Sequence, residues 1–214
     1  MAAAHAGAPA SGPRLTRKGQ ETHRRIVSEA AALMYERGVA CTSIEDVQAA
    51  AGVSASQIYY YYYYYYYFGD KRGLVRAVIN HQRDSVLGVQ QPLLTNLDSV
   101  EAVQAWRDVV VSIARDAPNQ QGCPIGSLTS ELARSAPEAR ADLAAGFSQW
   151  ERALRDGLHS MRARGELPDP QRFALALLAA VQGGLVLTQA RRDTVALEAS
   201  LDTLIDCLRD HTDR

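Results

Sequence analysis

Cysteine, phenylalanine and tryptophan are scarce in this chain of 214 residues, and its formal net charge is only −1. The three cysteines, Cys41, Cys123 and Cys207, are widely spaced and form no C-x-x-C pair, which argues against a disulfide framework and against a zinc site. The five histidines show no metal-ligand spacing, and the sequence contains neither a G-x-S-x-G motif nor a glycine-rich phosphate loop. We therefore predict a protein that is not an enzyme, with no catalytic residues, no metal and no cofactor.

Long uninterrupted apolar runs are also missing. The most apolar stretch, residues 173–188, contains Gln182 and is shorter than the roughly 20 residues that a membrane span needs. The start of the chain is rich in Ala, Gly and Pro but lacks the early positive charge and apolar core of a signal peptide. We predict a disordered tail over residues 1–15, no membrane partner and, because the cysteines suit a reducing compartment, a cytoplasmic location.

The small net charge hides an uneven distribution. Residues 1–80 carry nine Lys or Arg against six Asp or Glu, whereas residues 81–214 carry fourteen against eighteen. The N-terminal part is therefore the candidate for contact with a polyanion such as nucleic acid, although so small an excess does not decide the matter.

Helical periodicity dominates the sequence, and outside one run of tyrosines no segment alternates like a β-strand. The predicted fold class is all-α, with about nine helices. A three-helix unit with a helix-turn-helix occupies residues 16–69, and a helical bundle for ligand binding and dimerisation occupies residues 70–214.

Two of the first three helices have clear boundaries in the sequence. The first runs over about residues 16–37, carries one apolar face and stops at Gly38. Ser43 then caps a short second helix, with Asp46 three residues on as its capping-box partner. Gly52 ends that helix, because a residue without Cβ readily takes the left-handed conformation of a tight turn.

The third helix follows at once. Ser54 can cap it, with Gln57 as the reciprocal partner. The link Ala51-Gly52-Val53 is so short that the second and third helices must cross steeply, which is the arrangement of a helix-turn-helix.

Six further helices follow, each opened by a capping residue or a proline and each carrying an apolar stripe. They are predicted from Asp70 to about Leu87, from about Asp98, from the loop at residues 118–124 to about Ser135, over residues 137–165, from Asp169, and from Asp193.

Several motifs between Arg24 and Val78 occur in a familiar order. They are Ala30-Ala31 with Gly38, Thr42-Ser43-Ile44, Val47-Gln48-Ala49-Ala50-Ala51-Gly52-Val53-Ser54, Ile58-Tyr59 and Phe68-Gly69-Asp70-Lys71. This set resembles the tetracycline-repressor (TetR) family of transcriptional regulators. Further on, Gly122-Cys123-Pro124-Ile125-Gly126-Ser127-Leu128 with Glu131-Leu132 resembles the ligand-domain helix of one branch of these regulators, and residues 177–187 are similar to their dimerisation region.

The resemblance implies a ligand-responsive repressor. Such a protein binds a palindromic operator in double-stranded DNA as a homodimer, here through the predicted eighth and ninth helices, and a small-molecule effector releases it. The second helix of a helix-turn-helix enters the major groove, where its first residues face base edges. The implied DNA-binding residues are Thr42, Ser43, Ser54, Ala55, Ser56, Gln57, Tyr59, Tyr60 and Lys71.

These residues have different expected roles. Gln57 can pair with adenine through two hydrogen bonds, Ser56 can donate or accept, and Ala55 can pack on a thymine methyl. Thr42 and Ser43 offer hydroxyl groups and helix-start N–H groups to phosphates. Ser54 and Gln57 could equally do no more than cap a helix.

Pockets in helical bundles lie between facing helices. The candidate lining residues are Trp106, Cys123, Phe147, Trp150 and Gln182, each of which could instead belong to the core or to a dimer interface. Cys123 also precedes a helix start, where exposed N–H groups can lower the pKa of a thiol. A redox or electrophile sensor based on Cys123 is therefore an alternative.

Nine consecutive tyrosines, residues 59–67, depart from the family pattern. Related sequences place phenylalanine three residues after the first tyrosine, so six residues are surplus here. As continued helix they would add about 9 Å, turn the chain by roughly 240° and carry Phe68 away from the core it should fill.

Three interpretations stay open for the tyrosine run: an expansion of one or two aromatic positions in the recorded sequence, an inserted loop, or a platform that stacks on bases. A genuine run also leaves open a helical ligand-binding or scaffold protein with impaired DNA binding.

Overall fold

The computed structural model describes residues 16–54, 56, 68, 70–117 and 122–212. Within these ranges it contains ten helices and no strand, which confirms the all-α fold class. The helices are α1 (Arg17–Arg37), α2 (Ile44–Ala51), α4 (Lys71–Gly88), α5 (Gln91–Leu94), α6 (Val100–Asp116), α7 (Pro124–Leu132), α8 (Pro137–Gly157), α9 (His159–Ala163), α10 (Pro170–Arg191) and α11 (Val195–Thr212). The predicted N-terminal tail and most of the predicted third helix lie outside the described residues.

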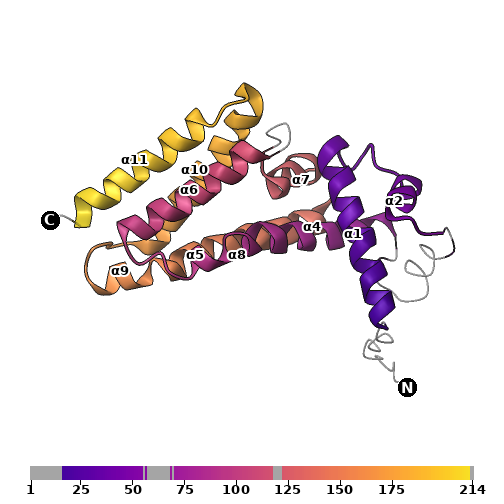
Figure 1. Cartoon of the computed structure of the whole chain (residues 1–214), viewed down its shortest axis with the longest axis horizontal. Helices are drawn as coiled ribbons and strands as arrows, with labels where there is room; N and C mark the ends of the chain where they lie inside the picture. Colours follow the sequence, from indigo (N-terminus) through magenta and orange to yellow (C-terminus); the bar gives the residue numbers. More distant parts are fainter. Residues whose placement is uncertain (1–15, 55, 57–67, 69, 118–121, 213–214) are drawn as a thin grey trace, which may run out of the picture.

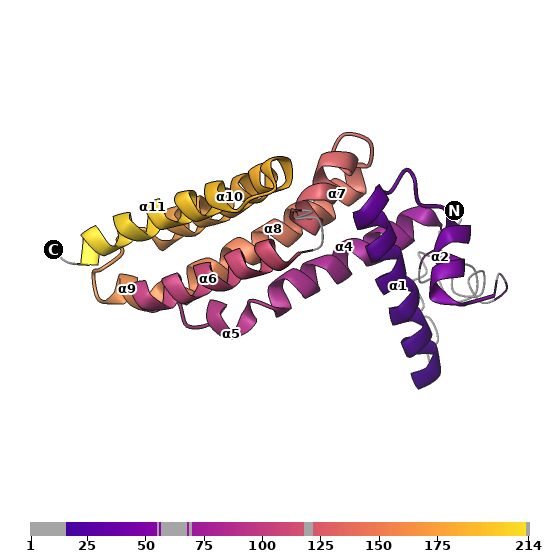
Figure 2. The same cartoon turned by 45° about the horizontal axis from the view of Figure 1, so that its top comes forward.

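The molecule is elongated, with α1 and α2 at one end and the long helices of the bundle extending away from them (Figure 1). Turning the molecule shows α1 running steeply across the direction of the bundle (Figure 2). Helix α4 packs against both α1 and α8. It therefore joins the N-terminal unit to the bundle, and a single hydrophobic core runs through both parts.

Helix α1 has well-defined ends. The Thr16 side chain accepts a hydrogen bond from the Gly19 N–H at 3.2 Å, and Gly38 ends the helix with a φ of 87°. Ile26 and Ala30 are fully buried on one face, which packs against α2 and α4. The predicted helix and its apolar face are thus present.

Two short helices were not predicted. Helix α4 ends at Gly88, but Pro92 then lies in the first turn of α5, where the missing proline N–H would have had no partner. The helix predicted over residues 137–165 is interrupted at Leu158, so that α9 follows α8 as a separate element. Both differences concern helix ends, and the order of elements is unchanged.

Helices α10 and α11 pack closely against each other and cover one side of the bundle (Figure 2). A Cβ atom at Gly184 of α10 would lie 2.7 Å from the Cα of Leu197, so only glycine permits this approach.

Helix α10 is also long and apolar enough to cross a membrane by length and composition. Its Leu177 and Val181 are fully buried in the core, so part of its apolar surface packs against the bundle.

Candidate functional site

The start of α2 contains the predicted capping box. The Asp46 N–H donates to the Ser43 hydroxyl at 3.1 Å, and the Ser43 N–H donates to the Asp46 carboxylate at 2.9 Å. Arg37 of α1 forms an ion pair with the same carboxylate at 2.9 Å. The hydrogen bonds from Ser43, with a smaller contribution from Arg37, lower the pKa of Asp46. Local capping therefore fixes the first helix of the helix-turn-helix and ties it to α1.

The turn after α2 also has the predicted conformation. Gly52 is left-handed, with φ 58° and ψ 42°, and the Val53 N–H donates to the Gln48 carbonyl at 3.2 Å. Val53 is buried, so the chain turns back over the core directly after α2. Ser54 and Ser56 are exposed, with their hydroxyl oxygens 2.9 Å apart. The other predicted base and backbone contacts beyond this turn, Ala55, Gln57, Tyr59 and Tyr60, lie outside the described residues.

Thr42 is placed differently from the prediction. Its side chain is 1% exposed, and its hydroxyl donates to the Gly38 carbonyl at 2.8 Å. Its N–H donates to the Val39 carbonyl at 3.3 Å. Both donors that were predicted to meet phosphate thus close the loop between α1 and α2. Ser43 is exposed, but its hydroxyl donates to Asp46 at 2.7 Å.

Lys71 begins α4 and is only partly exposed. Its ammonium group donates to the Val39 carbonyl at 2.9 Å, so it stabilises the same loop between α1 and α2. An ammonium group has three N–H donors, and this contact uses one of them. The position is compatible with a second contact to a phosphate.

Phe68 reaches the N-terminal core despite the tyrosine run. Its side chain is 3% exposed and stacks on His23 of α1, with ring centroids 4.8 Å apart and an interplanar angle of 10°. Burial lowers the pKa of His23. The displacement of Phe68 that a continuous helix would have caused is therefore absent.

The N-terminal unit is attached to the bundle through a carboxylate. Glu131 of α7 accepts the backbone N–H of Val39 at 2.8 Å and that of Ala40 at 2.7 Å. Hydrogen bonds to a charged acceptor are stronger than those between neutral groups. Glu131 thus holds the loop that precedes α2, and sequence reasoning missed this role because the partners are 91 and 92 residues away.

A cavity of about 260 Å³ lies inside the bundle. Its walls are formed by α4, α6, α8 and α10, together with α1 and the start of α7. The lining residues are Tyr35, Gln82, Ser85, Val86, Val89, Gln90, Val110, Ile113, Ala114, Ala117, Gly122, Cys123, Pro124, Trp150, Val181, Leu185 and Thr188. This set is called the bundle pocket below. It is mainly apolar with a few polar groups, which is the usual composition of a small-molecule site.

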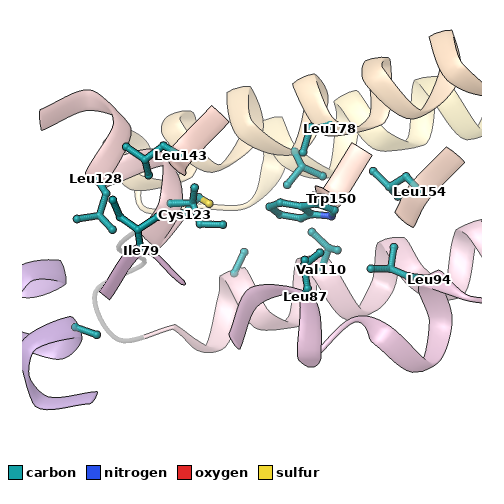
Figure 3. Close-up of a cluster of buried hydrophobic side chains, with 14 of the residues drawn as sticks. Ile79, Leu87, Leu94, Val110, Cys123, Leu128, Leu143, Trp150, Leu154 and Leu178 are labelled. Carbon is teal, nitrogen blue, oxygen red and sulfur yellow. The ribbon is translucent and has the colours of Figure 1, made fainter. Parts of the chain in front are cut away.

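Two of the five residues predicted to line a pocket do so, namely Cys123 and Trp150. Figure 3 shows the Trp150 ring between Leu178 on one side and Val110 and Leu87 on the other. Trp150 therefore forms part of the wall while also packing in the core.

The other three predicted residues are not among the lining side chains. Trp106 is fully buried, and its indole N–H donates to the Gln90 side chain at 2.9 Å. Phe147 packs against the core, and Gln182 lies beside Gly126 of α7. Trp106 thus supports the bundle pocket indirectly, because it fixes the Gln90 side chain that lines it.

Cys123 does not have the environment of a reactive thiol. Its side chain is 7% exposed, and burial raises its pKa despite the opposite effect of the backbone N–H groups of Gly126 and Ile125. The start of α7 does lower this pKa, as predicted, but burial has the larger effect and the net shift is upward. A thiolate is the reactive form of cysteine, so the alternative of a Cys123 redox or electrophile sensor is not favoured.

Tyr35 is a lining residue that the sequence did not reveal. It belongs to α1, yet its hydroxyl donates to the Gly122 carbonyl at 2.7 Å, and both residues line the bundle pocket. Burial, followed by the effect of Cys123, raises the pKa of Tyr35 to about 12. The pocket wall is thus shared between the bundle and the N-terminal unit.

A second surface of note lies on α10 and the start of α11. Large apolar side chains are exposed there, namely Leu175, Val186, Leu187 and Val195, with exposed fractions of 40–66%. An apolar patch of this kind is typical of an interaction surface.

The chain matches two protein-family profiles. Residues 26–63 match the tetR family of bacterial regulatory proteins, and residues 99–202 match the C-terminal domain of LmrA/YxaF-like transcriptional regulators. Together the two matches span the helix-turn-helix and most of the bundle.

Full-length relatives agree with these matches. An uncharacterised HTH-type transcriptional regulator in the lacX 3' region of Lactococcus lactis is 26% identical over 196 residues, covering 86% of this chain and 92% of the relative. The HTH-type transcriptional regulator TtgR of Pseudomonas putida is 26% identical over 207 residues, covering 92% and 95%. A TetR transcriptional regulator from Chloroflexus aurantiacus, solved as a crystal structure, superposes with a TM-score of 0.75 at 28% identity, covering 91% and 97%.

Proposed function

This chain belongs to the TetR family of bacterial transcriptional regulators, and from that premise we propose that it is a repressor that binds a palindromic operator as a homodimer and is released by a small molecule. The observation that carries the proposal is that two features share one continuous hydrophobic core. The capped helix α2 with its left-handed turn lies at one end, and a mainly apolar pocket lies in the attached bundle. TetR regulators are cytoplasmic DNA-binding proteins and not enzymes. We propose that this chain, too, is cytoplasmic and has no catalytic activity.

DNA binding is proposed for the face that carries the turn after α2. The exposed hydroxyls of Ser54 and Ser56 lie at the point where a reading helix would enter the major groove. Gln57 and Ala55 are proposed as base contacts, and Tyr59, Tyr60, Ser43 and Lys71 as backbone contacts, on the strength of the family likeness. Thr42 is removed from this set because its side chain is buried and its hydroxyl donates to the Gly38 carbonyl, whereas Ser43 is exposed.

The homodimer is proposed to form through α10 and α11. The support is the exposed apolar side chains of these helices, which would remain in contact with water unless a second copy covered them. Two copies that pack face to face would present two helix-turn-helix units to one side of the DNA. Successive major grooves are about 34 Å apart, so the dimer would read half-sites one helical turn from each other.

Release by an effector is proposed to work through the bundle pocket. A ligand changes operator affinity only if it binds one conformation better than the other. The pocket wall includes Tyr35 of α1 and Gly122 at the entry to α7, while Glu131 of α7 holds the loop before α2. A ligand that moves the start of α7 would therefore reposition the helix-turn-helix.

We also assign the chain to the branch marked by the segment Gly122-Cys123-Pro124-Ile125-Gly126-Ser127-Leu128. The segment lies within the region matched by the LmrA/YxaF-like C-terminal domain. In this structure it forms the start of α7 and contributes three residues to the bundle pocket.

The function is tested by selecting double-stranded DNA from a random pool with the purified full-length protein. The expected product is a palindrome whose half-site centres are about 10 base pairs apart, bound with an affinity that falls steeply with salt. If no sequence is enriched and no salt-sensitive binding appears, the chain is a helical scaffold or ligand-binding protein instead.

Two variants then separate the proposed contacts on the selected operator. Lys71→Ala should weaken binding about equally on all sequences and lower the salt slope by about 1, whereas Gln57→Ala should relax preference at one base pair. Arg162→Ala is the control, because it removes one exposed positive charge from α9 at the opposite end of the molecule (Figure 1). Identical behaviour of the Lys71 and Gln57 variants would contradict the assignment of roles.

A further inference from the structure

The bundle pocket is electrically neutral. None of its lining residues is Asp, Glu, Lys, Arg or His. The four residues between Ala117 and Gly122, which are not described, are Pro, Asn, Gln and Gln and carry no charge either. Burial holds Tyr35 and Cys123 in their uncharged forms near neutral pH, since it raises the pKa of both.

Charge strongly affects what such a pocket can bind. Moving an ionised group from water into an apolar site costs many kcal/mol unless an opposite charge or several hydrogen bonds compensate. The described walls supply no opposite charge. A charged ligand would therefore lose far more hydration energy than the site returns.

Two buried polar groups in the wall, on Thr188 and Trp150, lack a partner among the described residues. Thr188 of α10 is 1% exposed, and its hydroxyl has no hydrogen-bond partner among the described residues. Two other polar lining residues, Gln90 and Tyr35, already have hydrogen-bond partners within the protein. The Gln90 amide N–H donates to the Val86 carbonyl at 2.8 Å and its oxygen accepts from Trp106, while the Tyr35 hydroxyl donates to Gly122.

Trp150 offers an aromatic face, and its buried indole N–H has no partner among the described residues. Figure 3 shows the nitrogen-bearing edge of the ring on the side of Leu154, away from Cys123. The pocket therefore contains an aromatic wall, the indole N–H of Trp150 and the Thr188 hydroxyl, and the last two groups lack a partner among the described residues. A buried hydroxyl without a partner costs about 1–3 kcal/mol, which a ligand oxygen can recover.

Building on the effector site of the proposed function, we propose that the bundle pocket binds an uncharged compound of one or two rings whose carbonyl or hydroxyl oxygen pairs with the Thr188 hydroxyl. The cavity volume of about 260 Å³ lies near the lower end of the range of about 300–1,000 Å³ for small-molecule sites, which sets the size. The rings pack between Trp150 and the aliphatic side chains of α6 and α10.

Four probes of similar shape test the class of ligand: 2-acetylnaphthalene, 2-ethylnaphthalene, 2-naphthoate and the 2-naphthylmethylammonium ion. Binding to the full-length protein is measured by isothermal calorimetry without DNA. The ketone should bind about tenfold more tightly than the hydrocarbon, and the two ions at least a hundredfold more weakly than the ketone. Equal binding of ketone and hydrocarbon, tighter binding of either ion, or no binding of the ketone overturns the proposal.

Thr188→Val tests the hydroxyl itself. Valine has nearly the same shape, so the variant should lose the preference for ketone over hydrocarbon while its melting temperature stays constant or rises. A purely structural role predicts the reverse, namely a lower melting temperature and an unchanged preference. The control is Thr22→Val in α1, where the hydroxyl donates to the Lys18 carbonyl at 3.0 Å and the preference should persist.

The outcomes for ligand and function are separable because each is measured alone. If the protein binds its selected operator but none of the probes as expected, the repressor function is supported and the proposed ligand class is wrong. If it binds the ketone through Thr188 but binds no DNA, the ligand class is supported and the repressor function is wrong.

Discussion

The Tyr35 hydroxyl of α1 donates a hydrogen bond of 2.7 Å to the carbonyl of Gly122, which lies 87 residues further along the chain. Gly122 directly precedes Cys123 and the start of α7, and all three positions border the bundle pocket. The helix that supports α2 and the segment that bounds the pocket are therefore joined by this hydrogen bond, in addition to the contacts of Glu131.

We expect Tyr35→Phe to keep the aromatic ring in the pocket wall but to remove the hydrogen bond between α1 and Gly122. Loss of the hydrogen bond should lower the free energy of unfolding by about 1 kcal/mol, measured by urea denaturation. It should also reduce the ratio of operator affinities without and with 2-acetylnaphthalene, because the pocket then communicates less with α1.

The control for Tyr35→Phe is Thr129→Val, which removes a hydroxyl donor to the Ile125 carbonyl within α7 and leaves the Tyr35 contact intact. It should lose similar stability and keep the affinity ratio. An unchanged ratio in the Tyr35 variant would limit that contact to a structural role.

Glu131→Gln tests the attachment of the loop before α2. A carboxylate accepts both backbone N–H groups, from Val39 and Ala40, whereas a glutamine amide has only one acceptor oxygen. One N–H therefore loses its partner, and stability should fall by about 1 kcal/mol. Operator affinity should fall as well, because the loop positions α2.

The control for Glu131→Gln is Glu138→Gln, which removes the same charge from an exposed position in the first turn of α8. Equal operator affinity in the two variants would show that the Glu131 contact does not position the helix-turn-helix.

Local features of the fold were predictable from the sequence. The capping box of Ser43 with Asp46 and the left-handed Gly52 depend on residues within a few positions of each other, and both are present. The apolar face of α1 follows from helical spacing, and Ile26 and Ala30 are buried on it. Patterns of this kind are encoded within one or two turns of helix.

The pocket was only partly predictable, because it depends on which face of each helix meets a neighbour. Trp106 and Trp150 have the same residue type and similar helical surroundings, yet only Trp150 lines the pocket. Trp106 instead pairs with Gln90, a contact between α6 and the residue that precedes α5. Tyr35 was missed because its partner is brought near by the fold and not by the sequence.

Val186→Glu tests the proposed dimer. Val186 is 64% exposed on α10, so a carboxylate is tolerated in a single copy but would be buried without a partner in a dimer. Light scattering after size exclusion should give a mass of 23.3 kDa for the variant and twice that for the unmodified protein.

The control for Val186→Glu is Ala105→Glu on the exposed face of α6, which should remain dimeric. If Val186→Glu also elutes at twice the mass of one chain, the interface lies elsewhere.

Glu198 connects α11 to α6 and to Thr194, which directly precedes α11. It accepts a hydrogen bond from the Thr194 hydroxyl and one from Arg115 of α6 at 3.1 Å, and Arg107 lies 3.6 Å from its other oxygen. The hydrogen bond from Thr194, followed by the hydrogen bond from Arg115 and the positive charges of Arg107 and Arg115, lowers the pKa of Glu198 below its ordinary value of 4.5.

A carboxylate whose pKa is lowered by folding stabilises the protein above its unfolded pKa, and this contribution disappears as the pH falls through the folded pKa. We expect Glu198→Gln to be less stable than the unmodified protein at pH 7, and the difference in free energy of unfolding to close progressively as the pH falls below about 4.5. Urea denaturation at pH values from 3 to 7 measures the difference. Glu36→Gln, exposed on α1, is the control and should show a difference that stays small over the same range. A Glu198 difference that is independent of pH would mean that the side chain contributes by packing and not by its charge.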